Sequence, residues 1–125
     1  MRTITLLFAI FFVHAHAFAQ NSGKKVDVHE LAAILDEGLL IIDVRTDLEF
    51  NKGHIPGAVN IDLQSKSFEN QVSDFDHNRA VYVYCHNGQR AFYGSEKLIS
   101  MGFTNVYALV GGMIRWQQAN KPVNY

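Results

Sequence analysis

Continuous apolar runs alternate with segments of helical spacing along this chain, and this alternation constrains the fold more than any other feature. The clearest apolar runs are residues 39–42, 80–84 and 106–110. A strand that is apolar at every position is covered on both faces, as in a parallel sheet flanked by helices. The alternation therefore predicts an α/β fold with a mainly parallel sheet and helices on both faces.

Weaker signals predict the remaining elements. We expect brief strands over 26–28 and 58–61, and a partly helical stretch over 63–75. Helices are predicted where apolar residues recur at helical spacing and the segment closes at a glycine or before a proline. These helices cover residues 29–37, 47–50, 91–101 and 113–120, and Thr46 is expected to cap the second of them.

The first nineteen residues have the pattern of a secretory signal peptide. Arg2 supplies one positive charge, residues 4–13 are almost wholly apolar, and Ala17 and Ala19 are small residues where a signal peptidase reads. The apolar core of about ten residues is too short to span a bilayer, which needs about twenty. We therefore expect cleavage after Ala19 and export to a bacterial periplasm.

The mature chain would contain about 106 residues, enough for a single domain with one core. We expect a flexible arm over 20–25 and a folded domain over 26–125. The formal net charge is −1, and it becomes −2 once Arg2 is removed. The sequence has no basic face for nucleic acid and no polybasic membrane patch, so we expect neither partner, no membrane span and a monomer.

The single cysteine of the chain, Cys85, stands where the strongest predicted strand ends. Gly88 follows in a short loop, and helix formers begin at about Arg90. Such a loop directs backbone N–H groups at the sulfur, and the next helix adds its positive end; both favour the nucleophilic thiolate. A single cysteine cannot form an internal disulfide, so its thiol is either inert in the core or kept for its reactivity. Its position at the carboxyl edge of the sheet, where reactive loops lie, favours reactivity.

Several motifs stand in order along most of residues 26–123. They are Asp43-Val44-Arg45, Glu49-Phe50, Gly53-His54-Ile55-Pro56-Gly57-Ala58, the Cys85 loop, Met101-Gly102-Phe103, and Gly111-Gly112-Met113 with Trp116. Together these motifs resemble the single-domain rhodanese family, and with the signal peptide the chain looks most similar to the small periplasmic rhodaneses of the phage-shock type. The resemblance implies a five-stranded parallel sheet and a thiosulfate sulfurtransferase that carries sulfur as a persulfide on Cys85.

The implied chemistry agrees with the loop residues. A thiolate attacks the outer sulfur of thiosulfate, sulfite leaves, and cyanide or a thiol later removes the sulfur, so no metal or organic cofactor is expected. Gly88 permits an unusual backbone conformation, and Arg90 is expected to attract the sulfonate end. His86, Asn87 and Gln89 are expected to complete the substrate-binding loop.

Other residues of the motifs are expected to be structural neighbours of the site. Asp43 and Arg45 are predicted to form an ion pair that fixes a loop, and Glu49 is expected beside it. His54 is expected to be a structural hydrogen-bonding residue. No histidine spacing typical of a metal site occurs, so no metal is expected.

The loop length argues against a phosphatase or an arsenate reductase. Four residues separate Cys85 from Arg90, whereas phosphatase-like relatives have five and so form a wider cradle. Two alternatives stay open beside the enzyme: a relay module that receives persulfide from a partner protein, and a scaffold with an unreactive cysteine. Disulfide exchange is disfavoured because a resolving cysteine is absent from the sequence.

Overall fold

The structure is a computed structural model, and it describes residues 23–125. The predicted signal peptide, its cleavage site and residues 20–22 of the predicted arm lie outside the described residues. Within the described part of the chain, no helix is long and apolar enough to cross a membrane.

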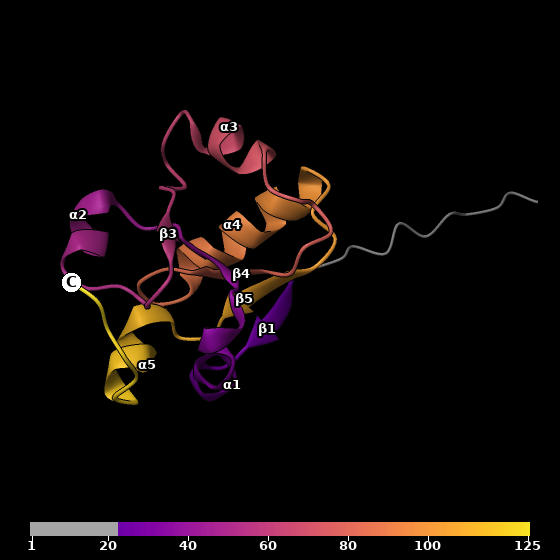
Figure 1. The fold of residues 1–125 in the computed structure, drawn as a ribbon. Coiled ribbons are helices and arrows are strands. Elements are labelled where there is room, and N and C mark those ends of the chain that lie inside the picture. Colours follow the sequence, from indigo (N-terminus) through magenta and orange to yellow (C-terminus); the bar gives the residue numbers. More distant parts are fainter. Residues whose placement is uncertain (1–22) are drawn as a thin grey trace, which may run out of the picture.

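The described residues form one five-stranded sheet in which every pairing is parallel (Figure 1). The strand order is β1-β5-β4-β2-β3, so β4 lies at the centre. This arrangement confirms the predicted α/β fold and the five-stranded parallel sheet. The strands are β1 (Lys24–Val26), β2 (Leu40–Asp43), β3 (Val59–Asn60), β4 (Val81–Tyr84) and β5 (Val106–Leu109).

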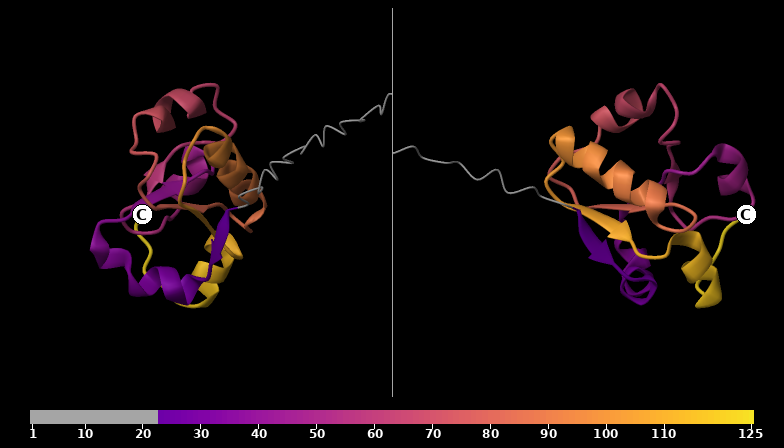
Figure 2. Two further views of the ribbon diagram at one scale, coloured as in Figure 1. Left: turned by 90° about the vertical axis from the view of Figure 1, so that its right-hand side faces the viewer. Right: turned by 180° about the vertical axis from the view of Figure 1, so that it is seen from behind.

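Helices cover both faces of the sheet, as the continuous apolar runs predicted. In Figure 2, α3 and α4 lie on one side of the sheet, and α1 and α5 lie on the other. The short α2 and the 3₁₀ turn η1 complete the helical elements. Their bounds are α1 (Val28–Ala33), η1 (Leu35–Glu37), α2 (Asp47–Asn51), α3 (Phe68–Ser73), α4 (Gln89–Ser100) and α5 (Gly112–Gln118).

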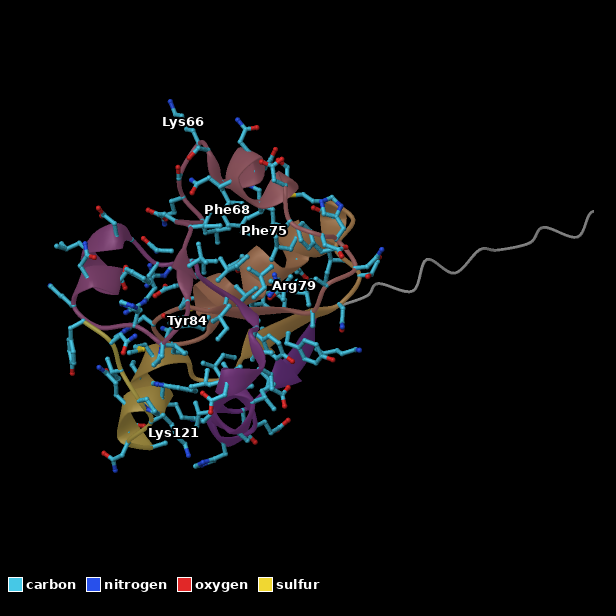
Figure 3. All side chains as sticks on the ribbon, in the orientation of Figure 1. Lys66, Phe68, Phe75, Arg79, Tyr84 and Lys121 are labelled. Atoms are coloured by element: carbon cyan, nitrogen blue, oxygen red, sulfur yellow. The ribbon has the colours of Figure 1, made fainter. Side chains whose placement is uncertain are left out.

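Each face of the sheet has its own hydrophobic cluster, and the central strands contribute to both. Val83 and Cys85 pack with α3 and α4, whereas Tyr84 packs with Met113 and Trp116 of α5. Figure 3 shows Phe68 of the first cluster, with Phe75 close by, between α3 and α4. Packing on both faces therefore holds the carboxyl ends of these strands in position, together with the loops that follow them.

Capping residues account for two of the helix starts. Thr46 accepts a hydrogen bond from the Glu49 N–H while the Glu49 side chain accepts from the Thr46 N–H, which is a capping box. The predicted Thr46 cap is therefore confirmed. Asp27 caps α1 through its side chain alone, which accepts from the N–H groups of His29 and Glu30.

The first strand corrects two predictions. It spans Lys24–Val26 rather than 26–28, because the Asp27 cap commits Val28 to α1. The prediction that residues 20–25 form a flexible arm is wrong for Lys24 and Lys25, which pair with Tyr107 and Ala108 of β5. The parallel pairing with an already buried strand overrides the polar character of the segment.

Several helix boundaries also differ from prediction. Helix α4 begins at Gln89, two residues before the expected start, because Gly88 supplies a left-handed N-terminal residue with φ of +101°. In the weakly periodic stretch 63–75, the α-helix is limited to Phe68–Ser73, where Phe68 and Val72 are the buried positions. The predicted helix over 29–37 is also divided, because α1 ends at Ala33 and the separate 3₁₀ turn η1 is the element that ends at the left-handed Gly38.

Candidate active site

The candidate site lies at the carboxyl ends of β2 and β4. The connection after β2 leads to β3 at one edge of the sheet, whereas the connection after β4 leads to β5 on the other side. Loops that diverge in this way leave a crevice between neighbouring strands, where ligands bind in open α/β sheets. The loop at 85–88 and the N-terminal ends of α2, α4 and α5 meet there (Figure 1).

Two backbone N–H groups point at the Cys85 sulfur. Gly88 N lies 3.1 Å from Sγ, and Ala91 N lies 3.3 Å from it. Such donors stabilise negative charge on the sulfur at the start of a helix whose dipole acts in the same direction. The predicted inward-facing N–H groups are confirmed, but one donor comes from Ala91, beyond the predicted loop 86–90.

The Cys85 side chain is fully covered, with 0% of the residue exposed, because it belongs to the cluster beneath α4. His86, Asn87 and Gln89 are exposed, whereas Gly88 and Arg90 are half-buried. The side chain of Asn87 accepts from Gln89 N at 3.0 Å and so helps to turn the chain into α4. Substrate contact by these loop residues stays a prediction.

The start of α5 packs directly against the backbone of the cysteine loop. Met113 N donates to Cys85 O at 2.8 Å, and Ile114 N donates to His86 O at 3.1 Å. Gly112 has φ of +56°, and a Cβ there would overlap Cys85 O and lie 2.6 Å from His86 O. Gly111-Gly112 entered the sequence analysis only as part of a family motif, so the requirement for glycine at this approach was missed.

Arg90 forms a two-pronged ion pair with Glu49 across the crevice. Its Nη1 and Nη2 each lie 2.8 Å from a different carboxylate oxygen of Glu49. The Arg90 guanidinium lowers the pKa of Glu49 to about 2, and the hydrogen bonds to Glu49 raise the pKa of Arg90. Glu49 thus lies beside the site as predicted, and the charge of Arg90 is already compensated there.

A buried ion pair stabilises the neighbouring loop after β2. Arg45 donates through Nε and Nη2 to both carboxylate oxygens of Asp43, with Nη2 2.7 Å from Oδ2. Burial lowers the pKa of Arg45, but the contact with Asp43 outweighs it and leaves that pKa raised. The same Nη2 donates to Gly53 O at 2.8 Å. The predicted loop-fixing ion pair is confirmed.

Two aromatic side chains join this framework. Tyr84 is fully buried, and its hydroxyl accepts from Ile55 N at 3.1 Å; burial raises the pKa of Tyr84. The ring of His54 stacks on Phe50 at 3.7 Å, and its Nδ1 lies 3.0 Å from Phe50 O. The structural hydrogen bond predicted for His54 is confirmed, whereas the contact between Tyr84 and Ile55 was not predicted.

A polar pocket of about 230 Å³ opens at the crevice. It is lined by Arg45, Glu49, Lys52, Gly53, His86, Met113 and Gln117. His86 brings the cysteine loop into this wall, and Lys52 was not among the predicted site residues. Among residues 23–125, no group of three or more His, Cys, Asp or Glu side chains is placed to hold a metal ion.

Comparison with known proteins matches residues 27–119 to the rhodanese-like domain. The chain is 32% identical over 101 residues to the thiosulfate sulfurtransferase GlpE of Shewanella oneidensis, covering 80% of this chain and 98% of that protein. It is 37% identical over 81 residues to the putative sulfur carrier protein YrkF of Bacillus subtilis, covering 65% of this chain and 43% of that protein.

The fold is likewise similar to solved structures. The rhodanese-like domain of an Anabaena protein superposes with a TM-score of 0.73 at 28% identity. The match covers 80% of this chain and 77% of the Anabaena domain. The similarity therefore extends over most of the residues that build the sheet and the crevice.

Proposed function

The chain belongs to the rhodanese-like domain family, and from this premise we propose that it is a sulfurtransferase with a persulfide intermediate on Cys85. The proposed donor is thiosulfate or a similar sulfur-containing anion, and the acceptor is cyanide or another thiophilic group such as a thiol. The observation that carries the proposal is the pair of N–H groups, from Gly88 and Ala91, on the Cys85 sulfur.

The first half-reaction is a displacement at sulfur. The Cys85 thiolate attacks the outer sulfur of thiosulfate, the S–S bond of thiosulfate breaks, and its electron pair leaves with sulfite. The outer sulfur of the new persulfide carries the negative charge. The same kind of backbone donors that stabilise the thiolate also suit this anion.

The second half-reaction returns the enzyme to its starting state. Cyanide or a thiolate attacks the outer persulfide sulfur, and the electron pair of the breaking S–S bond returns to Cys85. Both half-reactions are two-electron displacements that need no external oxidant or reductant. In this proposal His86, Asn87, Gly88, Gln89 and Arg90 form the loop that surrounds the transferred sulfur.

A relay module is the second candidate, and the complete burial of Cys85 favours it. A thiol with 0% exposure must be uncovered before it reacts, and a protein donor could do this on docking. The similarity to a putative sulfur carrier protein also supports this reading. Fast, saturable turnover of free thiosulfate at low concentration would argue against it.

Steady-state formation of thiocyanate from thiosulfate and cyanide tests the proposed enzyme. We expect turnover by the wild-type protein and none by Cys85→Ser, with an unchanged far-ultraviolet circular dichroism spectrum. Turnover by the serine variant would refute the assignment of Cys85.

We also propose that the protein is exported to a periplasm, on the strength of the apolar N-terminal segment and its small-residue cleavage site. N-terminal sequencing of the protein expressed in a Gram-negative host tests this, with Gln20 as the expected first residue. A full-length chain retained in the cytoplasm would contradict it.

A further inference from the structure

We propose that Lys52 binds the anionic end of the sulfur donor, so that the crevice selects donors with a sulfonate-type group. The inference rests on the proposed sulfurtransferase function and names the substrate class of that site. It arises from the charges that line the polar pocket between α2, the cysteine loop and α5.

Two arginines at the crevice are already engaged by carboxylates. Arg45 is 4% exposed and donates to Asp43 and to Gly53 O, so its charge is buried and compensated. Arg90 donates to both oxygens of Glu49. A dianion that enters the pocket therefore meets little net positive charge from either guanidinium.

Lys52 differs from both arginines. It lines the same pocket, its side chain is exposed, and within residues 23–125 it forms no ion pair. The carboxylate in the wall, Glu49, is held by Arg90. Lys52 is thus the uncompensated formal positive charge of the pocket, and the same pocket is lined by His86, the residue that follows Cys85 in the chain.

The backbone of Lys52 is held firmly although its side chain is exposed. As the C-terminal cap of α2, its N–H donates to Glu49 O and Phe50 O. The next residue, Gly53, donates to Phe50 O and accepts from Arg45. His54 then pairs with Asn124 through two backbone bonds of 2.9 Å. The Asp43–Arg45 pair therefore fixes the point from which the lysine reaches the pocket.

A lysine in this position suits the leaving group. The inner sulfur of thiosulfate leaves with its three oxygens as sulfite. A compact ammonium on a flexible four-carbon stem can stay in contact with these oxygens while the S–S bond breaks. A charge-assisted contact of this kind is stronger than a neutral one, but exposure to solvent reduces it. We expect about a tenfold effect on the reaction with an anionic donor.

The test compares Lys52→Gln with Lys66→Gln, a lysine on the loop before α3 that Figure 3 shows far from α5. The rate of sulfur gain by Cys85 is measured by intact-protein mass spectrometry over a range of thiosulfate concentrations. Alkylation by uncharged iodoacetamide measures the reactivity of the thiol itself. We expect about a tenfold loss of thiosulfate reactivity for Lys52→Gln, unchanged alkylation, recovery in Lys52→Arg, and no change for Lys66→Gln.

An unchanged thiosulfate rate in Lys52→Gln, or equal losses in both reactions, would overturn the inference. A binding experiment separates the inference from the proposed function. Titration calorimetry measures the affinity of thiosulfate for Cys85→Ser and for the double variant that also carries Lys52→Gln. If the wild-type protein gains no sulfur, the proposed function fails, and the binding comparison alone decides the role of Lys52. Weaker binding without the lysine supports that role, and equal or undetectable binding in both variants refutes it.

Discussion

Gly112 is the residue whose substitution most directly tests how α5 holds the cysteine loop. Its φ of +56° is unfavourable for any residue with a Cβ, at roughly 1–2 kcal/mol. The added Cβ also overlaps Cys85 O and lies 2.6 Å from His86 O, so the helix must retreat. That retreat weakens the bonds from Met113 N and Ile114 N, each worth about 1 kcal/mol. We therefore expect Gly112→Ala to lower the free energy of unfolding by about 3 kcal/mol or more.

Gly38→Ala is the matched control for this prediction. Gly38 also has a left-handed conformation, with φ of +67°, but a Cβ there meets nothing within 4 Å. Gly38→Ala should therefore lower the free energy of unfolding only by the conformational penalty of about 1–2 kcal/mol. Urea denaturation of both variants measures the difference. Equal destabilisation by the two substitutions would refute the idea that a close backbone approach, rather than backbone conformation, requires glycine at 112.

Three further predictions follow from the ion pairs and the loop. Because the pKa of Glu49 is lowered to about 2 from 4.5, its stabilising contribution is present above about pH 4.5 and is lost as the pH falls towards 2. Urea titrations should show this loss, about 1 kcal/mol after solvent screening, in the wild type but not in Glu49→Gln; identical acid profiles would contradict it. Arg45→Met leaves Asp43 buried without its partner, so thermal and urea unfolding should show a loss of about 3–5 kcal/mol, and a loss under 1 kcal/mol would contradict it. Gly112→Ala should also slow sulfur loading by roughly tenfold or more, since the loop that positions Sγ shifts; a wild-type loading rate would show that α5 does not hold the loop.

The sheet could be predicted because its central strands are almost continuously apolar, with Asp43 at the end of β2 as the charged exception. Ile41, Ile42, Val81 and Val83 are all buried, and burial on both faces occurs only between two layers of helices. The edge strand β1 was placed wrongly because Lys24 and Lys25 are exposed and carry no such signal. Its pairing depends on β5, more than eighty residues later in the sequence.

The cysteine loop was predictable because its determinants are local. Cys85, Gly88 and the start of α4 are consecutive in the chain, so the strand–loop–helix pattern places the N–H groups. Contacts between distant segments were not predictable in the same way. Arg90 and Glu49 are 41 residues apart, and α5 meets the loop only after β5 has crossed the sheet. Lys52 was missed for the same reason. Its proposed role depends on the pairing of Arg45 and Arg90 with carboxylates, which only the folded structure shows.

The mass of the intact protein after incubation with thiosulfate tests the central claim most directly. We predict the gain of one sulfur atom by the wild-type chain, its loss on addition of cyanide, and no gain by Cys85→Ser. A wild-type mass that stays unchanged, although the thiol reacts once the protein is unfolded, would contradict a persulfide formed on Cys85 from a free anion.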